Sequence, residues 1–177
     1  MIKPAFSLIL GSILLLSSCK NSNTMKYQTK QLPSFYLVGI WVRTTNQNNQ
    51  SQKDIGELWG KYMQENIAAK IKNKVSDDVY CAYTDYESDE TGKYTTLLGC
   101  KVKSLDSIPP GMIGITVPES TYRVYTSIGK LPDCVVNTWM NIWKTHINRK
   151  FATDFDVYGA KANDQSNAEV ETFLSVK

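Results

Sequence analysis

Histidine is almost absent from this sequence: His146 is the only one among 177 residues, and the chain has only four cysteines. No group of histidines, cysteines and carboxylates shows the spacing of a zinc site. The sequence also lacks a serine, histidine and acid set for nucleophilic catalysis and a glycine loop for phosphate binding. His146 falls late in an expected helix, where a histidine interacts with the helix dipole, and this position gives little support for haem ligation. We therefore predict no metal site and no cofactor.

A strong excess of charge of one sign is absent as well. Lysine and arginine total 20, aspartate and glutamate total 17, and the formal net charge is +3. Both signs are scattered without a basic run, whereas a basic patch is the usual footprint of a nucleic-acid-binding domain. Nucleic acid is therefore not a predicted partner. The length suits one domain with a sizeable core and is too short for two ordinary ones.

The first residues contain an apolar run, Phe6 to Leu16, that is shorter than the about 20 residues of a membrane-spanning helix. A short basic start precedes it, and Leu16-Ser17-Ser18-Cys19 follows. This pattern resembles a bacterial lipoprotein signal, which implies cleavage before Cys19, a diacylglycerol on its sulfur and acylation of its amine. An ordinary secretory leader or a short membrane anchor is the alternative. We expect a signal peptide at 1–18, an acylated Cys19 with a flexible tether to residue 33, and a domain at 34–177 anchored by lipid to a membrane of the bacterial cell envelope, outside the cytoplasm.

The rest of the chain repeats one order of elements twice. Alternating apolar residues and β-branched or aromatic composition predict strands, and apolar residues at helical spacing predict helices. The first copy comprises a strand at 35–43, a helix capped by Asp54 and a hairpin formed by 78–87 and 94–102. The second comprises a strand at 121–126, a helix from Pro132 and a hairpin formed by 154–159 and 169–176. This duplication predicts an α+β fold with pseudo-twofold symmetry, in which two helices cover one face of a largely antiparallel sheet and the other face carries a ligand cleft.

Several segments together resemble the GyrI-like, or AraC-type effector-binding, domain. They are Val38-Gly39-Ile40, Arg43-Thr44-Thr45, Leu58-Trp59, the hairpin from Val79 to Val102, and Asp154-Phe155-Asp156-Val157-Tyr158-Gly159. The resemblance implies a duplicated strand-helix-strand-strand fold with a central cleft that binds amphipathic, often cationic, small molecules through aromatic rings and a buried carboxylate. Many relatives carry a fused DNA-binding region, and this sequence shows none.

Alternation along the strands divides their residues between the two faces of the sheet. The helices are expected to cover the face bearing Val38, Ile40, Tyr83, Leu98, Val102, Phe155, Val157, Val170, Leu174 and Val176. The opposite, ligand-binding face is expected to bear Trp41, Tyr80, Tyr86, Tyr125, Asp156, Tyr158, Glu171 and Phe173. Flat rings stack on cations, and a partly buried carboxylate selects cations over anions. The alternative is that the tyrosines are ordinary half-buried strand residues.

A turn centred on Asp164-Gln165 would place Asp156 opposite Phe173 and Tyr158 opposite Glu171. The family commonly has Glu at the position of Asp156 and often Tyr at that of Phe173. Asp is shorter than Glu by one methylene, and Phe lacks the hydroxyl of Tyr. Glu171 beside Tyr158 is therefore the candidate that supplies the contact between a carboxylate and the charge of the ligand. The alternative for Glu171 is a solvated acid on an edge strand.

Three cysteines remain once Cys19 is acylated. A first hairpin centred between Glu90 and Thr91 would place Cys81 directly opposite Cys100, near the separation that a disulfide requires. The envelope is oxidising, which favours such a bond. The alternative is that both are small buried residues in a hairpin whose register is shifted by one or two.

These patterns favour a lipid-anchored protein, a monomer or a weak dimer, that binds amphipathic or cationic small molecules. A hydrolase is the second hypothesis, because some relatives cleave electrophilic compounds with an acid and a tyrosine, here Asp156 or Glu171 with Tyr158. The third is an envelope protein-interaction module. Enzyme activity is not the favoured interpretation.

Overall fold

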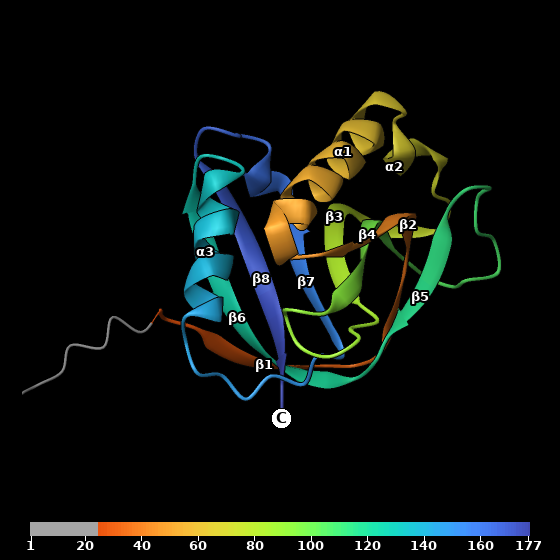
Figure 1. The fold of residues 1–177 in the computed structure, drawn as a ribbon. Helices are drawn as coiled ribbons and strands as arrows, with labels where there is room; N and C mark the ends of the chain where they lie inside the picture. Colours follow the sequence, from red (N-terminus) through yellow and green to blue (C-terminus); the bar gives the residue numbers. More distant parts are fainter. Residues whose placement is uncertain (1–24) are drawn as a thin grey trace, which may run out of the picture.

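A computed structural model describes residues 25–177 (Figure 1). The predicted signal peptide and Cys19 lie outside the described residues. Within residues 25–177, no helix is both long and apolar enough to cross a membrane.

One antiparallel sheet of eight strands organises the fold, and it has the order β1-β6-β8-β7-β3-β4-β2-β5. The order β2-β4-β3 is mirrored by β6-β8-β7 around the central pair β3 and β7. This symmetry confirms the predicted duplicated α+β fold. The strands are β1 (Gln28–Leu32), β2 (Phe35–Thr45), β3 (Lys74–Thr84), β4 (Lys93–Val102), β5 (Ile113–Val117), β6 (Ser120–Gly129), β7 (Thr153–Tyr158) and β8 (Ala168–Val176).

Each half contributes one main helix, and both lie on the same side of the sheet (Figure 1). Helix α1 (Gln50–Gln64) follows β2, and α3 (Asp133–Trp143) follows β6. Helix α1 begins four residues before the predicted cap Asp54, whose carboxylate instead accepts a hydrogen bond from Thr44 Oγ1 at 2.7 Å. The shorter elements are η1 (Gln47–Asn49), α2 (Ile67–Lys70) and η2 (Ala160–Ala162).

The two faces of the sheet bury three apolar clusters. Helix α1 packs on one cluster that includes Val38, and α3 packs on a second that includes Leu174. The face without helices is also packed, because the curled sheet brings the edge residues Leu32 and Val117 against Phe155 in a third cluster. The prediction of an open cleft on this face was therefore wrong: burial of aromatic rings fills it.

The predicted tether is partly a strand. Residues 28–32 form β1, which pairs with β6 from Gln28 opposite Val124 to Leu32 opposite Ser120. Before it, the Tyr27 ring lies 5.7 Å from that of Tyr125. A flexible tether thus does not extend to residue 33, because the polar side chains of this segment suit an edge strand with one face in solvent.

Both predicted hairpin registers were wrong. In the first, Cys81 lies opposite Leu98 and Val79 opposite Cys100, so the register differs by two residues and the cysteines are not direct partners. Both thiols are buried and free in the structure. In the second, Asp156 lies opposite Thr172. The connection there contains η2 rather than a tight turn, and this changes the register by one.

Two glycines face each other across the pair β2 and β4. Gly39 is paired with Gly99, and a Cβ on either residue would overlap the backbone of the other strand. Glycine is required at this contact because any larger residue would force the strands apart.

Candidate ligand-binding site

A cavity of about 620 Å³ lies between α1 and α3, on the helix-bearing side of the sheet. Strands β3 and β7 contribute Tyr83 and Tyr158 to its lining, so it stands over the central pair of strands. Its position places the candidate cleft on the face opposite to the one predicted. The remaining lining residues are Asn46, Asn49, Ser51, Gln52, Ile55, Gly56, Trp59, Tyr86, Glu90, Tyr94, Pro132, Val135, Val136, Trp139, Met140, Trp143, Lys144 and Arg149.

Aromatic rings from both halves form much of the cavity wall. Trp59 of α1 contacts Tyr158 edge-on with ring centroids 4.9 Å apart. Trp139 of α3 contacts Tyr83 in the same way at 5.1 Å. These paired contacts fix the rings, and fixed rings lining a cavity suit a flat apolar or cationic ligand.

Asp156 lies beneath these rings and is completely buried. Its carboxylate accepts hydrogen bonds from Tyr83 OH at 2.7 Å, Trp139 Nε1 at 3.1 and 3.2 Å, and Thr172 Oγ1 at 2.6 Å. Burial raises the pKa of Asp156 from 3.8 to about 6, although the hydrogen bonds from these three side chains act in the opposite direction. Two cavity rings are therefore oriented by an acid whose protonation changes near pH 6.

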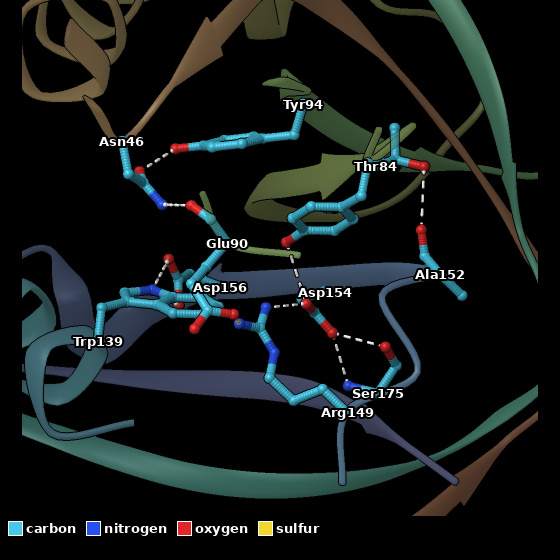
Figure 2. Close-up of polar contacts among 11 residues, drawn as sticks. Asn46, Thr84, Glu90, Tyr94, Trp139, Arg149, Ala152, Asp154, Asp156 and Ser175 are labelled. Carbon is cyan, nitrogen blue, oxygen red and sulfur yellow. Dashed lines mark hydrogen bonds and ion pairs between the residues drawn. The ribbon is translucent and has the colours of Figure 1, made fainter. Parts of the chain in front are cut away.

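A second buried carboxylate, Asp154, is fully paired. Its carboxylate accepts hydrogen bonds from Arg149 Nη2 at 2.7 Å and from Tyr86 OH at 3.0 Å. It also accepts hydrogen bonds from the backbone nitrogen and the hydroxyl of Ser175, at 2.6 and 2.7 Å (Figure 2). Arg149 also stacks on Phe151, with 4.1 Å from the guanidinium to the ring centroid. Asp154 thus fixes one cavity wall, because both Arg149 and Tyr86 line the cavity.

The turn between β3 and β4 adds Glu90 to the cavity lining. Arg149 Nη1 lies 3.3 Å from Glu90 Oε2, and the Glu90 side chain is 36% exposed. Asn46 holds the backbone of this residue, because its Nδ2 donates to the Glu90 carbonyl at 2.9 Å (Figure 2). Tyr94 OH donates in turn to Asn46 Oδ1 at 2.7 Å. Among residues 25–177, Glu90 is the only acidic residue that lines the cavity.

The predicted binding residues divide into three groups. Tyr86 and Tyr158 line the cavity, and Asp156 lies directly beneath it. The other predicted residues lie outside the lining: Tyr80 and Phe173 belong to the core of the opposite face, Tyr125 packs against α3, Trp41 is exposed, and Glu171 forms an ion pair with Lys30 at 2.9 Å.

Sequence reasoning missed the helix residues of the site. Trp59 entered the prediction only through the segment Leu58-Trp59 that resembles the family, Tyr83 was assigned to the helix-covered face, and Trp139, Trp143 and Glu90 were not assigned to a binding site. A signal was present in the tryptophans, because both helices carry these large rings and both lie on one face of the sheet. No group of three or more His, Cys, Asp or Glu residues in the described part of the chain is placed to hold a metal ion.

The duplicated fold and the aromatic cavity between its helices define a small-molecule-binding effector-binding domain. A family model described as Cass2, integron-associated effector binding protein, matches residues 28–176. The chain belongs to this family.

Individual relatives agree with this assignment. The protein YobU of Bacillus subtilis (strain 168) is 30% identical over 147 residues, which cover 80% of this chain and 91% of that protein. The structure of SAV2435 bound to tetraphenylphosphonium has a TM-score of 0.72 and 25% identity, over 86% of this chain and 94% of that one. The integron cassette protein VCH_CASS2 from the mobile metagenome of Vibrio cholerae has a TM-score of 0.68 and 27% identity, over 85% and 95% of the two chains.

Proposed function

We propose that this protein binds hydrophobic cations in the cavity between α1 and α3. The observation that carries the proposal is the cavity itself, which combines aromatic walls from both halves with the carboxylate of Glu90. The similarity to SAV2435, solved with the cation tetraphenylphosphonium, supports the same ligand class here.

Elementary energetics favour a cation over an anion in this cavity. Each ring that faces a cation contributes about 0.5–2 kcal/mol, depending on how far the pair is removed from water. Arg149 does not make the wall basic, because its charge is paired with Asp154 at 2.7 Å and Glu90 at 3.3 Å. Lys144 also lines the cavity but is exposed, so solvent screens its charge.

The experiment compares two ligands of matched shape and opposite charge, tetraphenylphosphonium and tetraphenylborate. Binding is measured on residues 25–177, which include β1, by quenching of tryptophan fluorescence. We expect the cation to bind at least about tenfold more tightly than the anion. Equal affinity for both would overturn the proposed cation preference.

A pair of tryptophan variants locates the site. Trp59→Leu removes a ring from the cavity wall and should weaken binding of tetraphenylphosphonium, whereas Trp41→Leu removes an exposed ring outside it and should leave binding unchanged. Binding lost equally in both variants would place the site elsewhere. Binding of neither ion would favour the alternative of a protein-interaction module.

The hydrolase hypothesis has less support from the geometry. Glu171 forms its ion pair with Lys30 away from the cavity. Asp156 is completely buried, and its oxygens already accept hydrogen bonds from three side chains. A general base must reach the water that it activates, and neither carboxylate is placed to do so.

Anchoring through an acylated Cys19 is the second part of the proposed function. This proposal rests on the lipoprotein-like pattern at residues 1–19. Two or more acyl chains on Cys19 would hold the protein stably at a membrane. The domain would then capture amphipathic cations at the membrane surface of the cell envelope.

A further inference from the structure

Three carboxylates lie in or near the cavity, and two of them are already occupied. Asp156 accepts hydrogen bonds from three side chains and Asp154 binds Arg149, Tyr86 and Ser175, and both acids are completely buried. Neither offers a free oxygen to a ligand in the cavity. Any direct contact between a carboxylate and a bound cation therefore has to involve another acid.

Glu90 has the position and the freedom for this contact. Its side chain is 36% exposed and makes one ion pair, with Arg149 at 3.3 Å, whose own side chain is only 6% exposed. The residue also lines a neighbouring cavity of about 310 Å³, so there is space on both sides of its side chain. Its backbone is held by Asn46, so the carboxylate can turn without movement of the loop.

Arg149 keeps its other contacts if its ion pair with Glu90 breaks. The guanidinium keeps its buried partner Asp154 at 2.7 Å and its stacking contact with Phe151. An arginine with a buried partner on one side and a half-exposed partner on the other loses the exposed one more easily, because solvent compensates the released charge. The pair is therefore asymmetric: Arg149 is fixed and Glu90 is exchangeable.

We propose that Glu90 is the residue that recognises the charge of the ligand, and that a bound cation takes the place of Arg149 as its partner. Glu90 of the empty protein is held by an internal cation at the cavity wall. On binding, its carboxylate turns to the ligand while the aromatic rings contact the apolar groups. This inference rests on the proposed function and names the specificity-determining residue of that site.

The test uses Glu90→Gln with Glu87→Gln as the matched control. Glu87 lies in the same turn and also forms an ion pair, with Arg43 at 3.2 Å, but it does not line the cavity. Both substitutions remove one negative charge from the same loop. Each variant is titrated with tetraphenylphosphonium, tetraphenylborate and the neutral triphenylphosphine oxide.

We expect Glu90→Gln to weaken tetraphenylphosphonium binding about tenfold, whereas Glu87→Gln changes it by less than about twofold. Triphenylphosphine oxide should bind equally to all three proteins, because its recognition needs the rings and no charge. A general loss of structure in Glu90→Gln would weaken the neutral probe as well, so this probe separates folding from recognition. Tetraphenylborate should bind Glu90→Gln at least as well as the unmodified protein.

Three outcomes would overturn the inference. The first is an equal loss of cation binding in both variants, which would indicate only a long-range charge effect. The second is full cation preference in Glu90→Gln together with its loss in Asp156→Asn, which would assign recognition to the buried acid. The third is an unmodified protein that does not distinguish tetraphenylphosphonium from tetraphenylborate; this result would refute the proposed function itself, unlike the first two.

Discussion

Asp156 brings an ionisable group into the protein interior without a basic partner among the described residues. Replacement by asparagine tests the consequence of this arrangement. Asparagine has nearly the same shape; its oxygen can accept from Trp139 and Tyr83, and its amide can donate to the hydroxyl oxygen of Thr172, which acts as donor or acceptor. Asp156→Asn therefore removes the charge and can retain one hydrogen bond with each of the three side chains, with the direction reversed at Thr172.

The size of the effect follows from the pKa. Burial raises the pKa of Asp156 from 3.8 to about 6. Between pH 3.8 and about pH 6 the unfolded chain has lost a proton that the folded protein retains on Asp156. The contribution of protonated Asp156 to the free energy of unfolding is therefore fully present below pH 3.8 and is lost as the pH rises through about 6. The full difference corresponds to about 3 kcal/mol. As the pH rises through this range, the free energy of unfolding of the unmodified protein should fall by this amount relative to that of Asp156→Asn.

The assay is urea unfolding of both proteins at about pH 4 and about pH 7.5. The free energy of unfolding of Asp156→Asn, minus that of the unmodified protein, should increase by about 2–3 kcal/mol between the two pH values. Glu171→Gln is the control, because Glu171 is partly exposed and its ion pair with Lys30 contributes at most about 1 kcal/mol. A difference that is the same at both pH values for Asp156→Asn would refute the reasoning, since Asp156 would then titrate like an ordinary exposed acid.

Two further predictions concern the sheet and the anchor. Gly99→Ala should reduce the free energy of unfolding by about 2 kcal/mol or more, because its Cβ would overlap the carbonyl of Val38, whereas Gly60→Ala in α1 meets no neighbour and should increase it by about 0.5–1 kcal/mol. An unchanged free energy of unfolding of Gly99→Ala in chemical denaturation would contradict the close contact between Gly99 and the backbone of β2. Cys19→Ser should move the full-length protein from the membrane fraction to the soluble fraction, and unchanged fractionation would exclude the acylated anchor.

The sequence predicted the elements of this fold better than the faces of its strands. Apolar alternation correctly placed Val38, Leu98 and Leu174 under the helices. In β7 the same rule failed, since Phe155 enters the core of the opposite face and Asp156 points to the helices. Alternation identifies a buried face by its apolar residues, so a strand that buries a hydrogen-bonded carboxylate is assigned the wrong way round.

One short sequence match between the two halves does not predict equivalent positions in the sheet. Asp78-Val79-Tyr80 and Asp156-Val157-Tyr158 match in sequence, yet Tyr80 packs in the core of the helix-free face and Tyr158 lines the cavity on the other. Matching residues thus occupy opposite faces of the sheet. The symmetry of the strand order does not depend on this motif, and it is the order that defines the two halves.

The duplication accounts for the position of the cavity. Each half buries its own helix on its own strands, so the cores under α1 and α3 are separate clusters. Both clusters contact Tyr83 and Tyr158, which stand on the central strands where the halves meet. Neither helix needs to cover this seam in order to complete its own core, and the space above it remains for a ligand. Under the proposed function, charge selectivity comes from a residue that breaks the symmetry, and Glu90 is the acid of the cavity lining that does so.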